Sequence, residues 1–183
     1  MTGRRTKYYI DTNDDGEEAI FHKDNKDKPV SNWYSEVLPY GLVCGESKYY
    51  YMVVRHDGKE AIFYINDKDE PVSDWYAIIY SSGLIKDESI YYIVMRDDDK
   101  QAIFKLSDKY TPVSNWHYAI DVHGLIMGES EFYATIDFSE ERRTVYHVRD
   151  KDNPVDSTTL KKLCPVCYRD IQKCSFHQKE RGF

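Results

Sequence analysis

The sequence lacks long hydrophobic segments, and this absence limits where the chain can act. No run approaches the roughly 18 apolar residues that span a bilayer, although apolar residues make up 41% of the 183 residues. The first residues, Met1–Lys7, contain no apolar stretch of the kind found in signal peptides. We therefore expect a cytoplasmic protein that makes no membrane contact.

Cysteine is scarce and unevenly distributed. Three of the four cysteines lie between residues 164 and 174, and Cys44 stands alone. A framework of disulfides needs paired cysteines spread through the chain, whereas a tight cluster is typical of a metal site. Cys44 occupies the position of Lys86 and Met127 in later repeats, and we interpret it as a semi-buried thiol without a function.

Motifs of nucleotide binding and of nucleophilic catalysis are missing. The chain has no Gly-x-x-x-x-Gly-Lys, Gly-x-Gly-x-x-Gly or Gly-x-Ser-x-Gly. The Asp-rich loops carry Lys26, Lys28 and Lys68 where a calcium loop needs oxygen ligands. We therefore expect no catalytic residues, no small-molecule substrate and no calcium. An enzyme with a groove between repeats stays open as an alternative, and it would need a pocket of several groups with shifted pKa values.

What the sequence does contain is one pattern repeated at a step of about 42 residues. Each copy has Ala-Ile-Phe, then Pro-Val-Ser-x-Trp, then Gly-Leu-Ile or Gly-Leu-Val, then Glu-Ser. The tryptophans are Trp33, Trp75 and Trp116. A fourth copy keeps Pro154-Val155 but has lost the Trp and the Gly-Leu. Units of this length cannot bury their own apolar faces and pack against their neighbours.

The second copy shows the expected elements most clearly. Residues 49–54 and 60–65 are β-branched and aromatic, and they are joined through Asp57-Gly58, which predicts a hairpin. Ser73 has the character of a helix N-cap, and apolar residues at positions 75, 78 and 79 predict a short helix that ends at Ser82-Gly83. Leu84-Ile85 is expected to be a brief extended piece.

These elements predict a β-rich α+β fold of tandem ββα(β) repeats, stacked in an open or partly curved array. The predicted repeats cover about residues 3–47, 48–89, 90–130 and a degenerate 131–160, and a small zinc module covers 161–183. One Trp in each repeat is expected to pack in the core between neighbouring repeats, which we favour over a recognition stripe of aromatic side chains.

The most specific motif lies near the end of the chain. Cys164-Pro-Val-Cys167 is followed, after six residues, by Cys174-Ser-Phe-His177. Two pairs of ligands with this spacing can close a tetrahedral Cys₃His shell around Zn²⁺, and the first pair is similar to a zinc-knuckle turn. Four protein ligands leave no position for water, so the site is predicted to be structural. A redox Cys-x-x-C pair or free buried thiols are the alternatives, and another soft metal would fit the same shell.

The register of the repeats resembles that of tandem-repeat proteins from archaea, and it is similar in style to bacterial repeats built around Trp and Gly. The likeness covers roughly residues 3–160, and it departs from the bacterial type because Trp and Gly are not adjacent. It implies protein binding more than catalysis. Charged residues at 31% with few glutamines are also typical of thermophiles.

Charge separates the array from its tail. The net charge is −7, yet residues 161–183 contain six basic and two acidic residues. We expect a non-enzymatic scaffold that binds a protein partner or its own copy as a homodimer. The alternative is a ribosome-associated factor, for example in hibernation or subunit dimerisation, whose tail contacts rRNA. The cations available for that contact are Lys161, Lys162, Arg169, Lys173, Lys179 and Arg181.

Overall fold

Short β-strands make up most of the molecule. A computed structural model describes residues 6–86, 88–172 and 174. The strands are β1 (Tyr8–Thr12), β2 (Glu18–His22), β3 (Glu36–Leu38), β4 (Tyr50–Val54), β5 (Glu60–Tyr64), β6 (Ile78–Tyr80), β7 (Tyr91–Met95), β8 (Gln101–Lys105), β9 (Ile120–Asp121), β10 (Phe132–Asp137), β11 (Arg142–His147) and β12 (Asp150–Pro154). The helices are single turns: α1 (Ser82–Ile85), α2 (His123–Ile126) and α3 (Ser157–Leu160). The expected strand-rich fold with few helices is confirmed.

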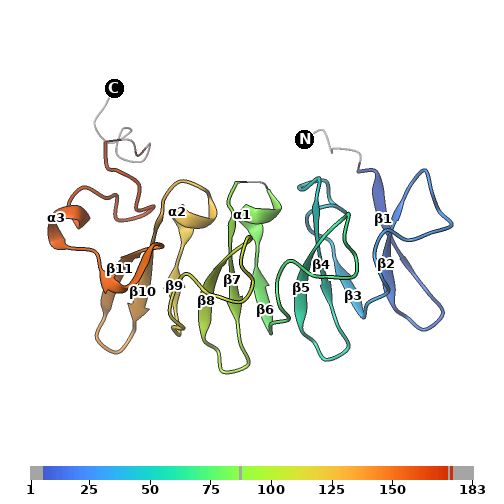
Figure 1. Ribbon diagram of the computed structural model, residues 1–183, viewed down its shortest axis with the longest axis horizontal. Helices are drawn as coiled ribbons and strands as arrows, with labels where there is room; N and C mark the ends of the chain where they lie inside the picture. Colours follow the sequence, from blue (N-terminus) through green and yellow to red (C-terminus); the bar gives the residue numbers. More distant parts are fainter. Residues whose placement is uncertain (1–5, 87, 173, 175–183) are drawn as a thin grey trace.

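The strands form four antiparallel sheets, which lie side by side in a row with the described parts of the two chain ends far apart (Figure 1). Their strand orders are β1-β2, β3-β4-β5, β6-β7-β8 and β9-β10-β11-β12. In the last three sheets, the first strand is a short piece that follows the hairpin of the preceding sheet. Each of these sheets therefore combines parts of two successive sequence repeats.

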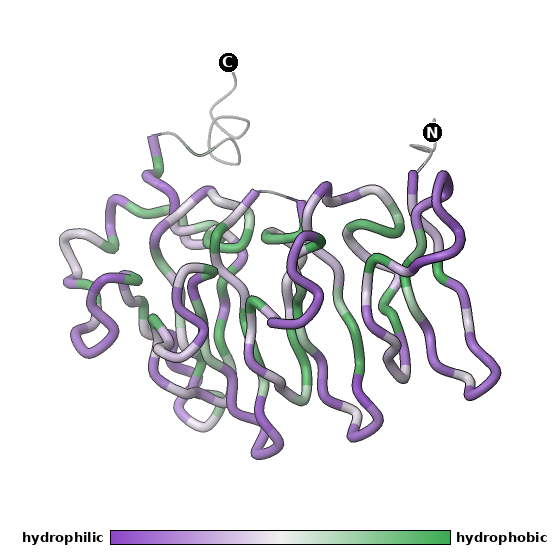
Figure 2. Tube along the Cα trace, turned by 45° about the vertical axis from the view of Figure 1, so that its right-hand side comes forward, coloured by the Kyte–Doolittle hydropathy of each residue, from purple (hydrophilic) through white to green (hydrophobic). Residues whose placement is uncertain are grey.

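The predicted hairpin of the second repeat is present as β4 and β5. Its turn contains Gly58, with a φ of +80°, a conformation that side chains with a Cβ rarely adopt. Tyr50 pairs with Tyr64 and Val54 with Glu60 across the two strands. The strands are hydrophobic and the turns at their ends hydrophilic (Figure 2), which explains why this part of the fold follows from sequence alone.

The predicted helix at residues 73–82 is wrong, and so is the extended Leu84-Ile85. Residues 78–80 form strand β6, and Leu84-Ile85 lie in helix α1. The Ser73 hydroxyl accepts a hydrogen bond from the Ile62 amide at 2.9 Å, on the edge of β5 that faces away from β4. Ser31 and Ser114 repeat this contact with Ile20 and Ile103. The serine thus completes a strand edge, and a strand explains the apolar positions 78 and 79 better than a helix does.

Both faces of the inner sheets are buried, because their alternate residues enter different cores. Tyr51 and Val53 of β4 pack toward the first sheet, whereas Met52 packs toward the third. In the same way, Tyr92 of β7 joins the core shared with β4 and β5, and Ile93 joins the core shared with β10. A sheet with two buried faces needs a neighbour on each side.

The tryptophans lie at the edges of these cores. Trp75 contacts Phe63 of its own unit and Tyr34 of the preceding unit, at ring distances of 6.0 and 6.3 Å. The Arg55 guanidinium lies 4.3 Å from the centre of the Trp75 ring. Trp116 repeats the arrangement. Core packing of these two rings is therefore partial, and an arginine covers part of each.

Polar contacts also connect neighbouring units. The Asn32 side-chain amide donates to the Lys68 carbonyl at 2.9 Å, and Lys109 pairs with Glu70 at 2.7 Å. Among the described residues, no helix has the length and hydrophobicity needed to cross a bilayer.

Candidate metal centre

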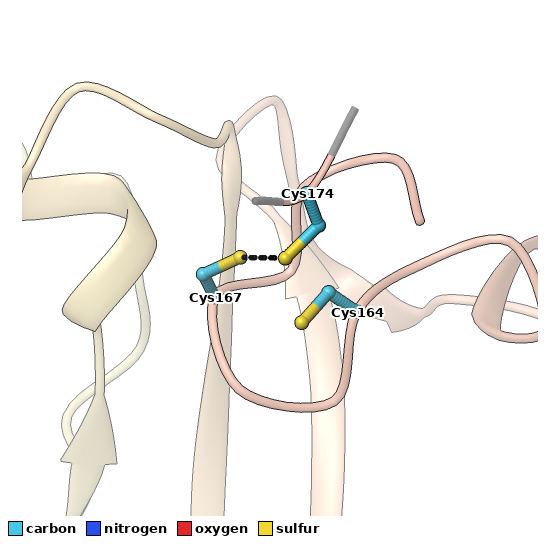
Figure 3. Close-up of side chains that lie close together, drawn as sticks. All are labelled: Cys164, Cys167 and Cys174. Carbon is cyan, nitrogen blue, oxygen red and sulfur yellow. Dashed lines mark hydrogen bonds between the residues drawn. The ribbon is translucent and has the colours of Figure 1, made fainter. Parts of the chain in front are cut away.

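Three cysteine side chains meet in the loops that follow helix α3. The ligand atoms of Cys164, Cys167 and Cys174 all lie within 4.8 Å of one another, and each residue is at most 3% exposed. The Sγ atoms of Cys167 and Cys174 point toward each other and are 3.5 Å apart (Figure 3). A disulfide needs about 2.05 Å, so no disulfide joins these two cysteines.

A tight turn brings the first two cysteines together. The Cys164 amide donates to the Arg169 carbonyl at 2.8 Å, and the Tyr168 amide donates to the Cys164 carbonyl at 2.9 Å. Tyr168 closes the turn with a φ of +55°, in the left-handed region that costs a non-glycine residue about 1 kcal/mol or more. Because Tyr168 is only 3% exposed, its packing compensates for the strain.

The donor set fits a soft metal ion. Sulfur ligands of a tetrahedral zinc ion, with bonds of about 2.3 Å, lie about 3.8 Å from one another, close to the separation of the Cys167 and Cys174 Sγ atoms. Burial raises the pKa of Cys167 to about 11, although the Arg169 main-chain amide opposes this and lowers it. A cation would offset that cost by holding the thiolate form. Cys164, Cys167 and Cys174 are thus placed as a candidate metal site.

The other residues that were predicted to be functional lie in different environments or outside the described residues. His177, the predicted fourth ligand, lies outside the described residues, as do Lys173, Lys179 and Arg181. Lys161 and Lys162 are exposed. Arg169 instead forms an ion pair with Glu129 at 2.7 Å, so its guanidinium is directed to the protein body. The Cys44 thiol was predicted to be semi-buried, but this residue is exposed.

The cysteine turn lies against the last sheet, a feature that sequence reasoning missed. The Tyr168 ring packs on Ala134 of β10 and Val145 of β11. Arg143 lies 5.2 Å from the centre of that ring and forms an ion pair with Asp121. The repeat period does not mark this residue, because the buried tyrosines 51, 92 and 133 recur every 41 residues whereas Tyr168 follows the last of them after 35.

Close main-chain contacts also hold the cysteine turn in its position beside the last sheet. The Ser130 hydroxyl donates to the Tyr168 carbonyl at 3.1 Å. A Cβ added to Gly124 would lie 1.8 Å from the Cys167 carbonyl oxygen, so only glycine permits this approach. Helix α2 and the loop before β10 are therefore in close contact with the cysteine turn.

A separate groove of about 490 Å³ lies between strands β3 and β6, lined by residues that include Met52, Tyr80 and Glu60. Burial raises the pKa of Glu60, and the Ile79 amide donates to its carboxylate at 2.7 Å. Glu18 makes the same contact with Val37 in the preceding unit. This carboxylate therefore anchors the next short strand, which is a structural role.

Comparison with known proteins gives no match, either to a protein-family model or to a curated protein sequence. The resemblance to archaeal and Trp-Gly repeat proteins stays a prediction.

Proposed function

We propose that the chain is a non-enzymatic scaffold for protein binding: an open array of four repeats whose C-terminal end is covered by a Zn²⁺-binding module. The observation that carries the proposal is the position of the cysteine turn on the last sheet. An array needs a different structure at its end, because the last unit otherwise exposes the face meant for the next one.

The cysteine turn makes the contacts that a following unit makes elsewhere. Within the array, Gly83 faces the Ile126 carbonyl of the next unit, and the Ser89 hydroxyl donates to the Leu125 carbonyl at 2.9 Å. At the end, Gly124 and Ser130 face two carbonyls in the same way, those of Cys167 and Tyr168. The turn therefore substitutes for the next unit while being much smaller.

Zn²⁺ explains how so short a segment keeps its shape. The turn has little apolar surface of its own, and a metal held by thiolates supplies folding free energy to such segments. We assign Cys164, Cys167 and Cys174 as three ligands and His177 as the fourth. With all positions taken by protein atoms the metal has no open site for substrate, which supports a structural role.

The proposal is tested on the full chain in two steps. Metal analysis of the purified protein is expected to give one zinc per chain, and chelation is expected to lower the melting temperature. Affinity capture at two salt concentrations is then expected to recover a protein partner. If chelation changes neither the melting profile nor the association state, the zinc module does not cap the array. If capture recovers no protein at either salt concentration, the scaffold function is wrong.

The same capture separates the scaffold from the ribosome-associated alternative. Contact with rRNA through Lys161 and Lys162 would weaken steeply with salt, because counterions are released from phosphates on binding. Co-sedimentation with ribosomes that disappears at high salt would favour that alternative.

A further inference from the structure

The opposite end of the row has no corresponding cover among the described residues. Its sheet contains only β1 and β2, whereas every other sheet has a short strand paired to the edge of its first hairpin strand. Glu36–Leu38 pairs in this way with Met52, Val53 and Val54 of β4. The equivalent edge of β1 has no paired strand among the described residues (Figure 1).

The open edge of β1 presents main-chain groups for a partner. The Asn13 amide donates to the Glu17 carbonyl and the Lys23 amide to the Lys7 carbonyl, so the odd-numbered residues carry the bonds to β2. Because hydrogen-bonded pairs alternate in antiparallel sheets, Ile10 and Thr12 direct their main-chain groups to the open edge, where the Thr12 amide donates to the neighbouring Asp11 carboxylate at 2.9 Å. An edge of this kind accepts an added strand.

The outer face of this sheet carries aromatic rings and an acidic group. We call it the N-terminal face and define it by Tyr9, Asp11, Phe21 and Trp33. Tyr9 stacks on Phe21 at 5.7 Å, and Trp33 meets Phe21 at 5.8 Å. Trp33 is 37% exposed, more than the equivalent Trp75 and Trp116, which are partly buried.

Two substitutions distinguish this face from the equivalent inner faces. Asn13 stands where Arg55 and Arg96 cover the rings of Trp75 and Trp116. The Asn13 side chain bonds instead to its own hairpin, at Glu17 and at the Asp15 amide. Among the described residues, the indole of Trp33 therefore lacks the cation that the other two indoles have.

The second substitution adds a negative charge. Asp11 is exposed at the position where Val53 and Val94 are buried completely. The Thr12 amide donates to this carboxylate at 2.9 Å, but a purely apolar cover would bury the charge without an opposite charge beside it, at considerable cost. The neighbouring turn is also acidic, with Asp14, Asp15 and Glu17. A second copy of this end would meet like charges, whereas a basic segment would meet opposite ones.

We propose that the N-terminal face and the open edge of β1 bind an extended, basic segment of a partner protein. The segment adds to β1 as a third antiparallel strand and directs an Arg or Lys side chain across β1, past Asp11, toward the ring of Trp33, whose segment runs along the opposite edge of β2. It thus supplies from outside the strand and the cation that the inner units obtain from this chain. The inference rests on the proposed scaffold function and specifies its binding surface and the class of its partner.

Synthetic peptides provide the test, with the full metal-loaded chain as receptor. The probe is an end-blocked eight-residue peptide of alternating Arg and Val. One control peptide has Glu in place of Arg, and another has Pro in place of Val, which keeps the charge but prevents strand pairing. Calorimetry is expected to detect binding of the first peptide only, and NMR to show slowed amide exchange at Ile10 and Thr12. Equal binding of the Pro peptide, or no binding of the Arg-Val peptide, overturns the proposal.

Variants of the protein locate the site. Asn13→Arg is expected to place a guanidinium of this chain over Trp33, held by Asp15 as Asp57 holds Arg55 at 2.7 Å. The affinity for the Arg-Val peptide is then expected to fall about tenfold. Thr12→Pro removes an edge amide, together with its bond to Asp11, without touching the bonds to β2, and is expected to weaken peptide binding by a similar factor. Asn66→Arg is the matched control, since it adds the same charge at an exposed position of the second unit. If Asn13→Arg and Thr12→Pro bind the Arg-Val peptide as tightly as Asn66→Arg and the original chain do, the peptide does not bind at the N-terminal face and the edge of β1.

Two further outcomes identify other occupants. A concentration-dependent dimer that Thr12→Pro abolishes would mean that a second copy pairs with β1, and the proposal would be overturned. Peptide binding that is seen only after removal of residues 1–5 would also overturn the proposal, because it would mean that the chain itself occupies the edge of β1. If a partner captured from lysate binds Asn13→Arg and the original chain equally, the scaffold function stands and this inference fails.

Discussion

The two end sheets of the row differ in what covers their outer faces. At the C-terminal end, a turn with three cysteines covers the last sheet and inserts Tyr168 against Ala134 and Val145. At the N-terminal end, the described residues provide no such cover, and Asp11 replaces a buried valine. In the proposed array the ends must differ from the interior: the cysteine turn covers one end, and the residues of the outer face differ at the other. The following predictions test this difference.

Loss of the metal site is expected to have the largest effect. Cys167→Ser should abolish metal binding and unfold the cysteine turn, because the turn has little core of its own. Amide exchange should then rise in β10 and β11 and stay unchanged in β1 and β2. Cys44→Ser is the control and should alter neither metal content nor exchange. Uniform exchange in all four sheets of Cys167→Ser would show that the turn does not protect the last one.

Truncation of the repeated tyrosines compares the ends directly. Tyr168→Ala is expected to cost about 3–5 kcal/mol of unfolding free energy, as does loss of a buried aromatic side chain elsewhere. Tyr9→Ala should cost about 1 kcal/mol, because Tyr9 is only partly buried. Denaturant titration measures both.

A conservative variant separates packing from hydrogen bonding at the same site. The Tyr168 hydroxyl has no hydrogen-bond partner among the described residues, so Tyr168→Phe should change stability little. Similar costs for Tyr168→Ala and Tyr9→Ala would mean that the two ends are equally uncovered.

Glycine substitutions probe the fit of the cysteine turn. Gly124→Ala should cost about 1–3 kcal/mol, because the new Cβ would collide with the Cys167 carbonyl. Gly83→Ala creates the same collision with Ile126 between inner units and serves as the internal reference. Amide exchange near Cys167 should rise in Gly124→Ala only, with zinc retained. Unaltered exchange there would contradict the proposed contact.

The smallest effects are expected at the tryptophans. Arg55→Gln should lower stability by about 0.5–1 kcal/mol through loss of the contact with Trp75. Asn13→Arg should raise stability by a similar amount, since it gives Trp33 the cover that Trp75 has. Thermal melting measures the stability of both variants against that of the original chain. A destabilised Asn13→Arg would mean that the first unit cannot adopt the inner arrangement.

The hairpins and the cysteine cluster could be predicted because their signals are local. Two apolar runs on either side of Asp57-Gly58 define two strands and a turn within about 16 residues. The spacing of Cys164 and Cys167 likewise places two thiols in one turn. His177, the predicted fourth ligand, lies outside the described residues.

The segment after each hairpin could not be predicted, because its conformation depends on distant residues. Positions 75, 78 and 79 fit a helical period, but residues 78–80 pair with β7, about 15 residues further along the chain. Ser73 likewise caps no helix, since its hydroxyl bonds to the Ile62 amide. Asp156, which follows Pro154-Val155 as Ser73 follows Pro71-Val72, does cap helix α3 through Thr158 and Thr159. The same local motif therefore has two outcomes.

The amino-acid sequence by itself determined the repeat period, the hairpins and the three clustered thiols, since each depends on residues close together in the chain. Only the tertiary structure decided that Tyr168 packs on Ala134, that Glu60 anchors β6 and that the edge of β1 lacks a paired strand among the described residues. These features arise where one unit meets the next. The free energy of such contacts depends on surfaces that exist only after the separate sheets have formed.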